Sequence, residues 1–176
     1  MTEPEILDHL RRAIDGAMRE TALPAIVTDA ETRLREQSDL QMTWASIPLP
    51  VYRDLPADVK SAWVFVLRGG ISTGAERHPN SRQRMVSYAG TGDMWTWDDS
   101  RWRSNVLPAK NGYSSSALSI PPNVWHRPVT PAGPDWTVLS FHTASDDQLI
   151  EERPQDDEHP DRGASKSELY AGRSHR

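Results

Sequence analysis

Residues 70–90 read GISTGAERHPNSRQRMVSYAG, and this stretch decides the fold. Glu76 and His78 are two positions apart, so on an extended segment their side chains point to the same side. Residues 79–81, Pro-Asn-Ser, predict a turn, and Gln83 begins the next strand. We expect that strand to pair antiparallel with the segment that carries Glu76 and His78, which would bring Gln83 across from them.

A second stretch, residues 115–130, reads SSALSIPPNVWHRPVT. Its Pro-Pro-Asn turn at 121–123 precedes His126 and can aim that side chain inward. Asparagine suits the last turn position, because it tolerates the left-handed backbone conformation. Together the two stretches can present two imidazoles, a carboxylate and an amide to one point, from His78, His126, Glu76 and Gln83.

The chain around these stretches consists of short apolar or alternating runs separated by turn residues. The run DMWTWDD at 93–99 places Trp95 and Trp97 on one face, as a strand does. Strands at such spacing, without helices between them, indicate an antiparallel barrel or sandwich. The expected strands lie at 61–68, 82–90, 93–99, 100–107, 114–120 and 136–143.

The stretch at 70–90 resembles the first sequence motif of the cupin superfamily. In words, that motif is Gly, five residues, His-x-His, three or four residues, Glu, six residues and Gly. Every interval matches between Gly70 and Gly90. Two letters differ, because Glu76 stands where the first His is usual and Gln83 stands where the Glu is usual.

The stretch at 115–130 resembles the second cupin motif, which runs Gly, five residues, Pro-x-Gly, two residues, His, three residues and Asn. Pro121 and His126 match it. Asn123 replaces the turn glycine, and the first and last positions depart from the motif at Ser115 and Thr130.

The resemblance implies an all-β fold, the cupin double-stranded β-barrel or jelly roll, over residues 61–145. Residues 1–60 are then expected to form an N-terminal helix and an extended segment packed on the barrel. Within them, AIVTDA at 25–30 has the character of a strand. Residues 146–176 are acidic and polar, which predicts a disordered tail.

The N-terminal helix is expected over residues 4–20. Thr2 with Glu5 fits a capping box just before it. Apolar residues then recur on one helical face, which predicts packing against the barrel or a partner subunit. They are Ile6, Leu7, Leu10, Ile14, Ala17 and Met18.

Cupins commonly bind a divalent metal ion with three His and one Glu, so the resemblance implies a metal site of Glu76, His78, Gln83 and His126. The carboxylate has moved from the third ligand position to the first, which leaves the net charge of the set unchanged. Glu76, His78 and His126 also make the two-His, one-carboxylate set that non-haem iron(II) favours. Iron is therefore the first metal expected, with zinc, manganese and nickel as the others.

A metal-free interpretation of the same residues stays open. His78 and His126 would then be hydrogen-bonded residues of a barrel that holds a small ligand, and Gln83 a hydrogen-bonding group of the pocket. The carboxylate of Glu76 would pair with an arginine near the barrel mouth. The neighbouring candidates are Arg77, Arg82 and Arg84.

Strand parity predicts further residues of the pocket. Met85 and Ser87 share a face with Gln83, and Ser140 shares one with His142. These four are expected to line the pocket, with His142 alternatively a structural residue at a strand end. Arg84 and Arg127 could bind an anionic group of a substrate, because a guanidinium suits a carboxylate. Their opposite strand parity favours outer salt bridges instead.

Two classes of function fit this sequence. The first is a metal-dependent enzyme acting on a small organic molecule, such as a non-haem iron dioxygenase or a non-redox isomerase, cyclase or lyase. The second is a metal-free module that binds or senses a small molecule. Fold alone does not choose between them.

Composition narrows the setting. The 176 residues carry a net charge of −5 without a basic block, so a nucleic-acid partner is not expected. There is no cysteine, which excludes disulfides and thiolate ligands. No apolar run approaches the roughly 20 residues of a membrane span. The first residues do not read as a signal peptide, so we expect a cytoplasmic protein, and a homodimer that covers exposed strand edges.

Overall fold

The structure is a computed structural model that describes residues 1–109 and 116–170. Ser115 of the second motif and the last residues of the predicted tail, 171–176, lie outside the described ranges. The helices are α1 (Glu3–Ala17), α2 (Ala22–Glu36) and a short 3-10 turn, η1 (Leu49–Val51). The strands are β1 (Met42–Ser46), β2 (Ser61–Leu67), β3 (Gln83–Ala89), β4 (Thr91–Trp97), β5 (Trp102–Arg103), β6 (Val106–Pro108), β7 (Ala117–Ile120), β8 (His126–Val129), β9 (Trp136–His142), β10 (Ile150–Pro154) and β11 (Ser165–Leu169).

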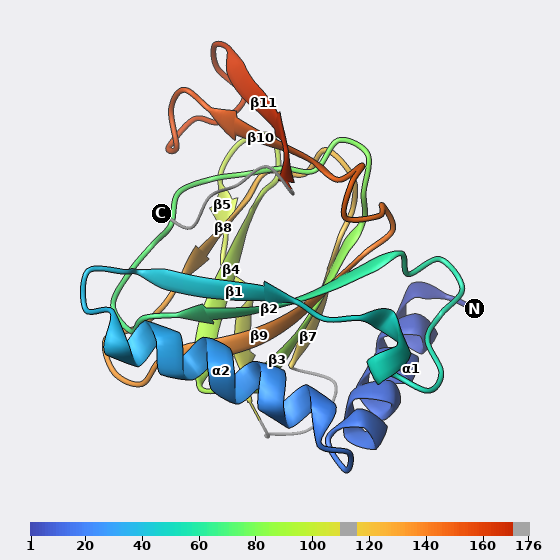
Figure 1. The fold of residues 1–176 in the computed structure, drawn as a ribbon. Coiled ribbons are helices and arrows are strands. Elements are labelled where there is room, and N and C mark those ends of the chain that lie inside the picture. The colour runs from blue at the N-terminus through green and yellow to red at the C-terminus, as the bar shows by residue number, and fades with distance from the viewer. Residues whose placement is uncertain (110–115, 171–176) are drawn as a thin grey trace.

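Two antiparallel sheets form the body of the protein (Figure 1). The larger sheet has the order β1-β2-β9-β3-β7, and in the smaller one β4 pairs with β5, β6 and β8. Inward side chains of both sheets share one core, with Phe65 and Val138 from the larger sheet and Met94 from the smaller. The spacing of the strands predicted an antiparallel barrel or sandwich, and the resemblance implied a barrel; this all-β architecture is confirmed.

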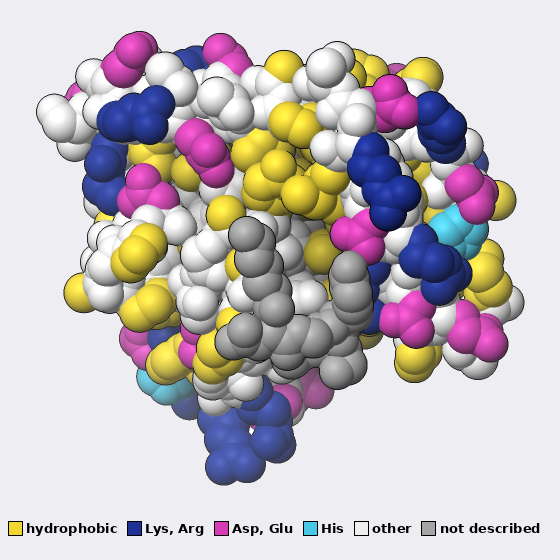
Figure 2. All heavy atoms as spheres, turned by 90° about the horizontal axis from the view of Figure 1, so that it is seen from below, with side chains coloured by type: hydrophobic (Ala, Val, Ile, Leu, Met, Phe, Trp, Pro, Cys, Tyr) yellow, Lys and Arg dark blue, Asp and Glu magenta, His cyan; other side chains and the backbone are white. Residues whose placement is uncertain are grey.

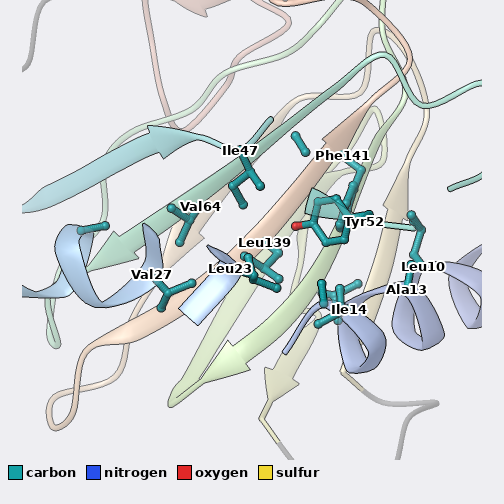
Figure 3. Packing of buried hydrophobic residues seen from close by; sticks show 14 of the residues in the cluster. Leu10, Ala13, Ile14, Leu23, Val27, Ile47, Tyr52, Val64, Leu139 and Phe141 are labelled. Carbon is teal, nitrogen blue, oxygen red and sulfur yellow. The ribbon is translucent and has the colours of Figure 1, made fainter. Parts of the chain in front are cut away.

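A second core lies on the outer face of the larger sheet, where the helices cover it (Figure 3). Alternation along β2 explains the two cores, since Phe65 points into the barrel while Val64 points to the helices. On that side Leu10 and Ile14 of α1 and Val27 of α2 meet the sheet. Strands buried on both faces need near-continuous apolar sequence, as β2 has.

The N-terminal segment differs from its prediction in one element. The helix α1 is present, and the backbone N–H of Thr2 donates to the Glu5 carboxylate at 2.6 Å, as a capping box requires. Residues 25–30, however, belong to α2 and not to a strand. Leu23, Val27, Ala30 and Leu34 are the buried face of α2. Their helical spacing outweighs the local strand character of 25–30 once that face packs on β1 and β2.

The prediction of a disordered tail is wrong for residues 146–170. Strands β10 and β11 pair antiparallel as a hairpin, which lies at the end of the barrel away from the helices (Figure 1). Leu149 and Glu151 have no exposed surface, and Tyr170 is buried. The acidic composition did not reveal these three buried residues, because each is buried by contact with parts of the barrel that are distant in the sequence.

The two outer arginines lie as their parity predicts. Arg84 is only 2% exposed, and its guanidinium donates to the carboxylates of Glu3 and Asp58 at 2.6 and 2.8 Å. Arg127 pairs with Glu158 at 2.7 Å and lies over the rings of two tryptophans. The outer salt-bridge role predicted for both arginines is confirmed.

The contact between Glu3 and Arg84 gives a pH-dependent prediction. Hydrogen bonding from the Arg84 guanidinium is the main cause that lowers the pKa of Glu3 below its usual value of 4.5. The stabilisation from Glu3 is therefore complete above about pH 4.5 and is lost as the pH falls through the lowered pKa. At pH 7, Glu3→Gln should lower the free energy of unfolding by about 1–2 kcal/mol, because Glu3 is partly exposed. The difference from the unmodified protein should shrink in acid.

Urea unfolding at several pH values measures this difference. The exposed Glu36 at the end of α2 supplies the control, since Glu36→Gln should change little at any pH. An equal loss at pH 3 and pH 7 for Glu3→Gln would show that the carboxylate charge is not the cause.

The surface agrees with the mixed charge of the sequence. On the face seen in Figure 2, Lys and Arg side chains alternate with Asp and Glu along the right side. Hydrophobic side chains gather near the upper middle of this face. Among the described helices, none combines the length and apolar character needed to cross a bilayer.

Candidate metal centre

Glu76, His78 and His126 meet at one point inside the barrel. The three residues each offer one ligand atom, and these atoms lie within 4.8 Å of one another. Oε1 of Glu76 is 3.6 Å from Nε2 of His126 and 4.0 Å from Nε2 of His78. Spacings of this size suit three ligands around one ion, because each ligand atom would lie about 2.0–2.2 Å from it.

The backbone fixes this arrangement. Glu76 and His126 exchange both backbone hydrogen bonds at 2.8 Å, so the first motif lies against the second. Asn123 adopts the left-handed conformation (φ 65°), and its N–H donates to the His78 carbonyl at 3.1 Å. The turn at 121–123 thus ties His126 to His78.

One sequence expectation about these strands is wrong. The strand that begins at Gln83 does not pair with the segment of Glu76 and His78, but with β7 and β9. The backbone of residues 76 and 77 is already bonded to His126 and Glu152. Gln83 therefore reaches the interior from the larger sheet, next to His142 on β9.

Both candidate imidazoles are oriented by backbone carbonyls. Nδ1 of His78 lies 3.0 Å from the Ile150 carbonyl, and Nδ1 of His126 lies 3.0 Å from the Val124 carbonyl. A carbonyl only accepts, so each Nδ1 carries the proton and each Nε2 keeps its lone pair. Nε2 of His126 is buried, and within residues 1–109 and 116–170 it has no hydrogen-bond partner.

Gln83 is buried beside these groups with its amide half satisfied. Its Nε2 donates to Ser140 Oγ at 3.0 Å, and Ser140 Oγ lies 3.1 Å from Nε2 of His142. Its Oε1 is buried without a hydrogen-bond partner among the described residues. An acceptor in this state is satisfied by a cation or by a donor beyond the described residues.

His142 points into the same interior but is engaged differently. Its ring stands edge-on to His78, with centroids 5.0 Å apart, and its Nε2 is bonded to Ser140. Burial lowers its pKa well below 6.5, with further lowering from His78 and His126. His142 is therefore a neutral neighbour of the three ligand candidates and does not join their group.

The hairpin adds residues that the sequence did not predict. Arg153 Nη2 lies 3.3 Å from Glu76 Oε2, and its Nε donates to Glu151 Oε1 at 2.8 Å. The ring of Tyr170 is 6.0 Å from that of His78. Burial, with the charge of Glu76, raises the pKa of Tyr170 well above 10, so its phenol is neutral.

The arginines proposed for Glu76 pair elsewhere. Arg77 bonds Glu152 at 2.6 Å, Arg82 lies 3.8 Å from Glu3, and Arg84 bonds Glu3 and Asp58. Arg153 takes their place beside Glu76. No pattern in the sequence pointed to it, because it lies 77 positions further along the chain in the predicted tail.

A small cavity of about 30 Å³ adjoins the candidate ligands. Met85 lines it, as its parity predicted, while Ser87 accepts a hydrogen bond from the Trp136 indole and Ser140 from Gln83. Its lining is mainly apolar, with a few polar groups. The lining residues are Met42, Phe65, Leu67, Thr73, Glu76, Gln83, Met85, Met94, Pro128, Trp136, Val138 and Tyr170.

Solved structures share this barrel. CapF bound to the inhibitor 3-isopropenyl-tropolone superposes with a TM-score of 0.52 at 13% identity, over 62% of this chain and 30% of that chain. The coconut allergen cocosin matches with a TM-score of 0.50 at 15% identity, over 64% of this chain and 28% of that chain. The chain has the cupin fold.

A third neighbour, the capsular polysaccharide assembling protein CapF from Staphylococcus aureus, matches with a TM-score of 0.51 at 14% identity, over 62% of this chain and 28% of that chain. The chain thus spans less than a third of the length of these neighbours. No protein-family model matches the chain, and no curated protein matches it by sequence. The likeness establishes the fold alone.

Proposed function

We propose that this cupin is a metal-dependent enzyme that acts on a small organic molecule. The observation that carries the proposal is the group of Glu76, His78 and His126, whose ligand atoms lie within 4.8 Å of one another, together with buried acceptors that lack donors. Nε2 of His126 and Oε1 of Gln83 have no hydrogen-bond partner among the described residues. Buried acceptors without donors are costly unless a cation satisfies them.

Glu76, His78 and His126 would hold the ion, with Gln83 as a fourth ligand. Two imidazoles and one carboxylate are the set that non-haem iron(II) favours, so iron comes first and zinc, manganese and nickel follow. A bound ion would supply Lewis-acid chemistry or, as iron, oxygen activation for a dioxygenase reaction. Tyr170, as a neutral phenol, would donate a hydrogen bond to the substrate, and the apolar lining would exclude water.

A metal-free binding module is the second candidate function, and one observation favours it. Glu76 already faces Arg153 at 3.3 Å, and Gln83, Ser140 and His142 form a connected chain of hydrogen bonds. This network partly satisfies the interior without an ion. A small molecule with a donor group would satisfy Gln83 Oε1.

Metal analysis of the purified protein separates the two functions. We expect close to one first-row transition ion per chain by plasma mass spectrometry after dialysis against metal-free buffer. Supplying iron, manganese, zinc or nickel to stripped protein should restore the same stoichiometry for at least one of them. Protein that stays empty with each ion supplied would favour the metal-free module.

We further infer that the protein acts in the cytoplasm as a homodimer. Strand β1, with Trp44, pairs with β2 of its own chain and forms one edge of the larger sheet. A second copy at such an edge would cover its backbone groups. Sedimentation at tens of micromolar tests the dimer, and a strict monomer would exclude it.

A further inference from the structure

We propose that Arg153 binds a carboxylate of the substrate beside the metal ion, so that the substrate is a small carboxylic acid with an apolar body. This rests on the proposed function, because it assumes an ion at Glu76, His78 and His126. Arg153 belongs to the C-terminal hairpin and not to the cupin motifs.

The geometry of Glu76 shows that the distance is suitable. Its Oε1 faces the two imidazole Nε2 atoms at 3.6 and 4.0 Å, whereas its Oε2 faces Arg153 Nη2 at 3.3 Å. One carboxylate therefore spans the gap between the ion position and the guanidinium. A substrate carboxylate beside Glu76 has the same span, so it would reach from the ion position to the guanidinium.

Arg153 has donors to spare. A guanidinium carries five N–H groups. Arg153 commits Nε to Glu151, one N–H of Nη1 to the Thr73 carbonyl at 3.3 Å and one of Nη2 to Glu76. Two N–H groups remain without a partner among the described residues, and the side chain is 35% exposed. A substrate can therefore reach them.

The guanidinium is held in place before any ligand arrives. Glu151, which has no exposed surface, fixes Nε of Arg153 from within the hairpin. A planar, pre-oriented guanidinium recognises carboxylate better than the flexible ammonium of a lysine does. The Thr73 carbonyl that accepts from Nη1 belongs to a residue of the cavity lining, so Arg153 lies next to the cavity.

The lining of the cavity indicates which chemical group the rest of the substrate carries. Its lining near Thr73 and Glu76 is mostly apolar, with Phe65 and Met94 among the side chains. Such a wall favours an aliphatic or aromatic group over a second charge. A carboxylate at one end and an apolar body at the other fit both parts.

Binding of simple probes to cobalt-loaded protein tests the proposal without knowledge of the reaction. Visible absorption of the bound Co²⁺ reports the titration of benzoate, pyruvate and, as the uncharged match of benzoate, benzamide. We expect benzoate or pyruvate to bind, and benzamide to bind at least 10-fold more weakly than benzoate. Arg153→Gln should weaken carboxylate binding by 10-fold or more and keep the cobalt content. Arg153→Lys should recover only part of the affinity.

The matched control is Arg77→Gln. Arg77 also joins the barrel to the hairpin, but its guanidinium pairs with Glu152. Its variant should bind carboxylates within about twofold of the unmodified protein. If unmodified protein takes up no cobalt, the proposed function fails. If cobalt binds and carboxylate binding is absent, equal to benzamide binding or unaffected by Arg153→Gln, the role of Arg153 is overturned while the metal site stands. If the Arg153→Gln protein loses its cobalt, the unmodified protein still tests the proposal. Binding of benzoate at least 10-fold tighter than benzamide would support it, and equal binding would overturn it.

Discussion

Replacing His126 with alanine should lower the metal content from about one ion per chain to near zero. His126 is 1% exposed, its Nδ1 is held by the Val124 carbonyl, and its Nε2 is directed at Glu76. Loss of one of the four proposed ligands should weaken binding by more than 100-fold, since even loss of a group that only orients a ligand costs 10–100-fold. The fold should remain, because the backbone bonds of residue 126 do not need the imidazole.

Plasma mass spectrometry after dialysis measures this effect, with circular dichroism to check the fold. His159 on the hairpin serves as the control, because its side chain is 45% exposed and lies outside the candidate centre. His159→Ala should keep its full metal content. A His126→Ala protein that binds as much metal as the control would exclude His126 as a ligand.

Replacing Trp136 with alanine should destabilise the barrel by about 3–5 kcal/mol, the usual cost of removing a large core aromatic. Trp136 has no exposed surface, and its indole N–H donates to Ser87 Oγ at 2.8 Å. Its ring packs directly on Gly92, where an added Cβ would come within 2.0 Å of the ring. The melting temperature should fall by roughly 6–20 °C for a chain of this size.

Thermal unfolding followed by circular dichroism measures the loss. Trp136→Phe should recover most of it, because the phenyl ring still fills the core and only the bond to Ser87 is missing. Ser87→Ala isolates that bond and should cost about 1–2 kcal/mol. A melting temperature of Trp136→Ala within 3 °C of the unmodified protein would contradict this view of the core.

The residues that the sequence placed together are those whose geometry is local. Glu76 and His78 share a side because they are two positions apart, and the Pro-Pro-Asn turn sets His126. These two features depend only on the backbone conformation of a few neighbouring residues, which the residue types at those positions indicate. The strand that pairs with Gln83 was predicted wrongly. That pairing depends on distant segments, because His126 and Glu152 already bond the backbone of residues 76 and 77.

The contributions of the hairpin could not be predicted from the sequence. Arg153 and Tyr170 reach the centre only because β10 and β11 fold back over the barrel end. Their neighbours in sequence are charged and polar, and composition then predicts disorder. In the same way, the strand character of residues 25–30 concealed α2, whose apolar face becomes clear only over its whole length.

The position of the hairpin in the chain sets an order of events during translation. Strand β9 lies between β2 and β3, so the larger sheet cannot close before the ribosome has made His142. Tyr170 follows 28 residues later, which takes roughly 1–6 s at ordinary rates of synthesis. A barrel that closes as soon as β9 is available stays open at this end for that interval. Until Tyr170 is made, its ring, which lies 6.0 Å from that of His78 in the finished protein, is absent from the candidate centre.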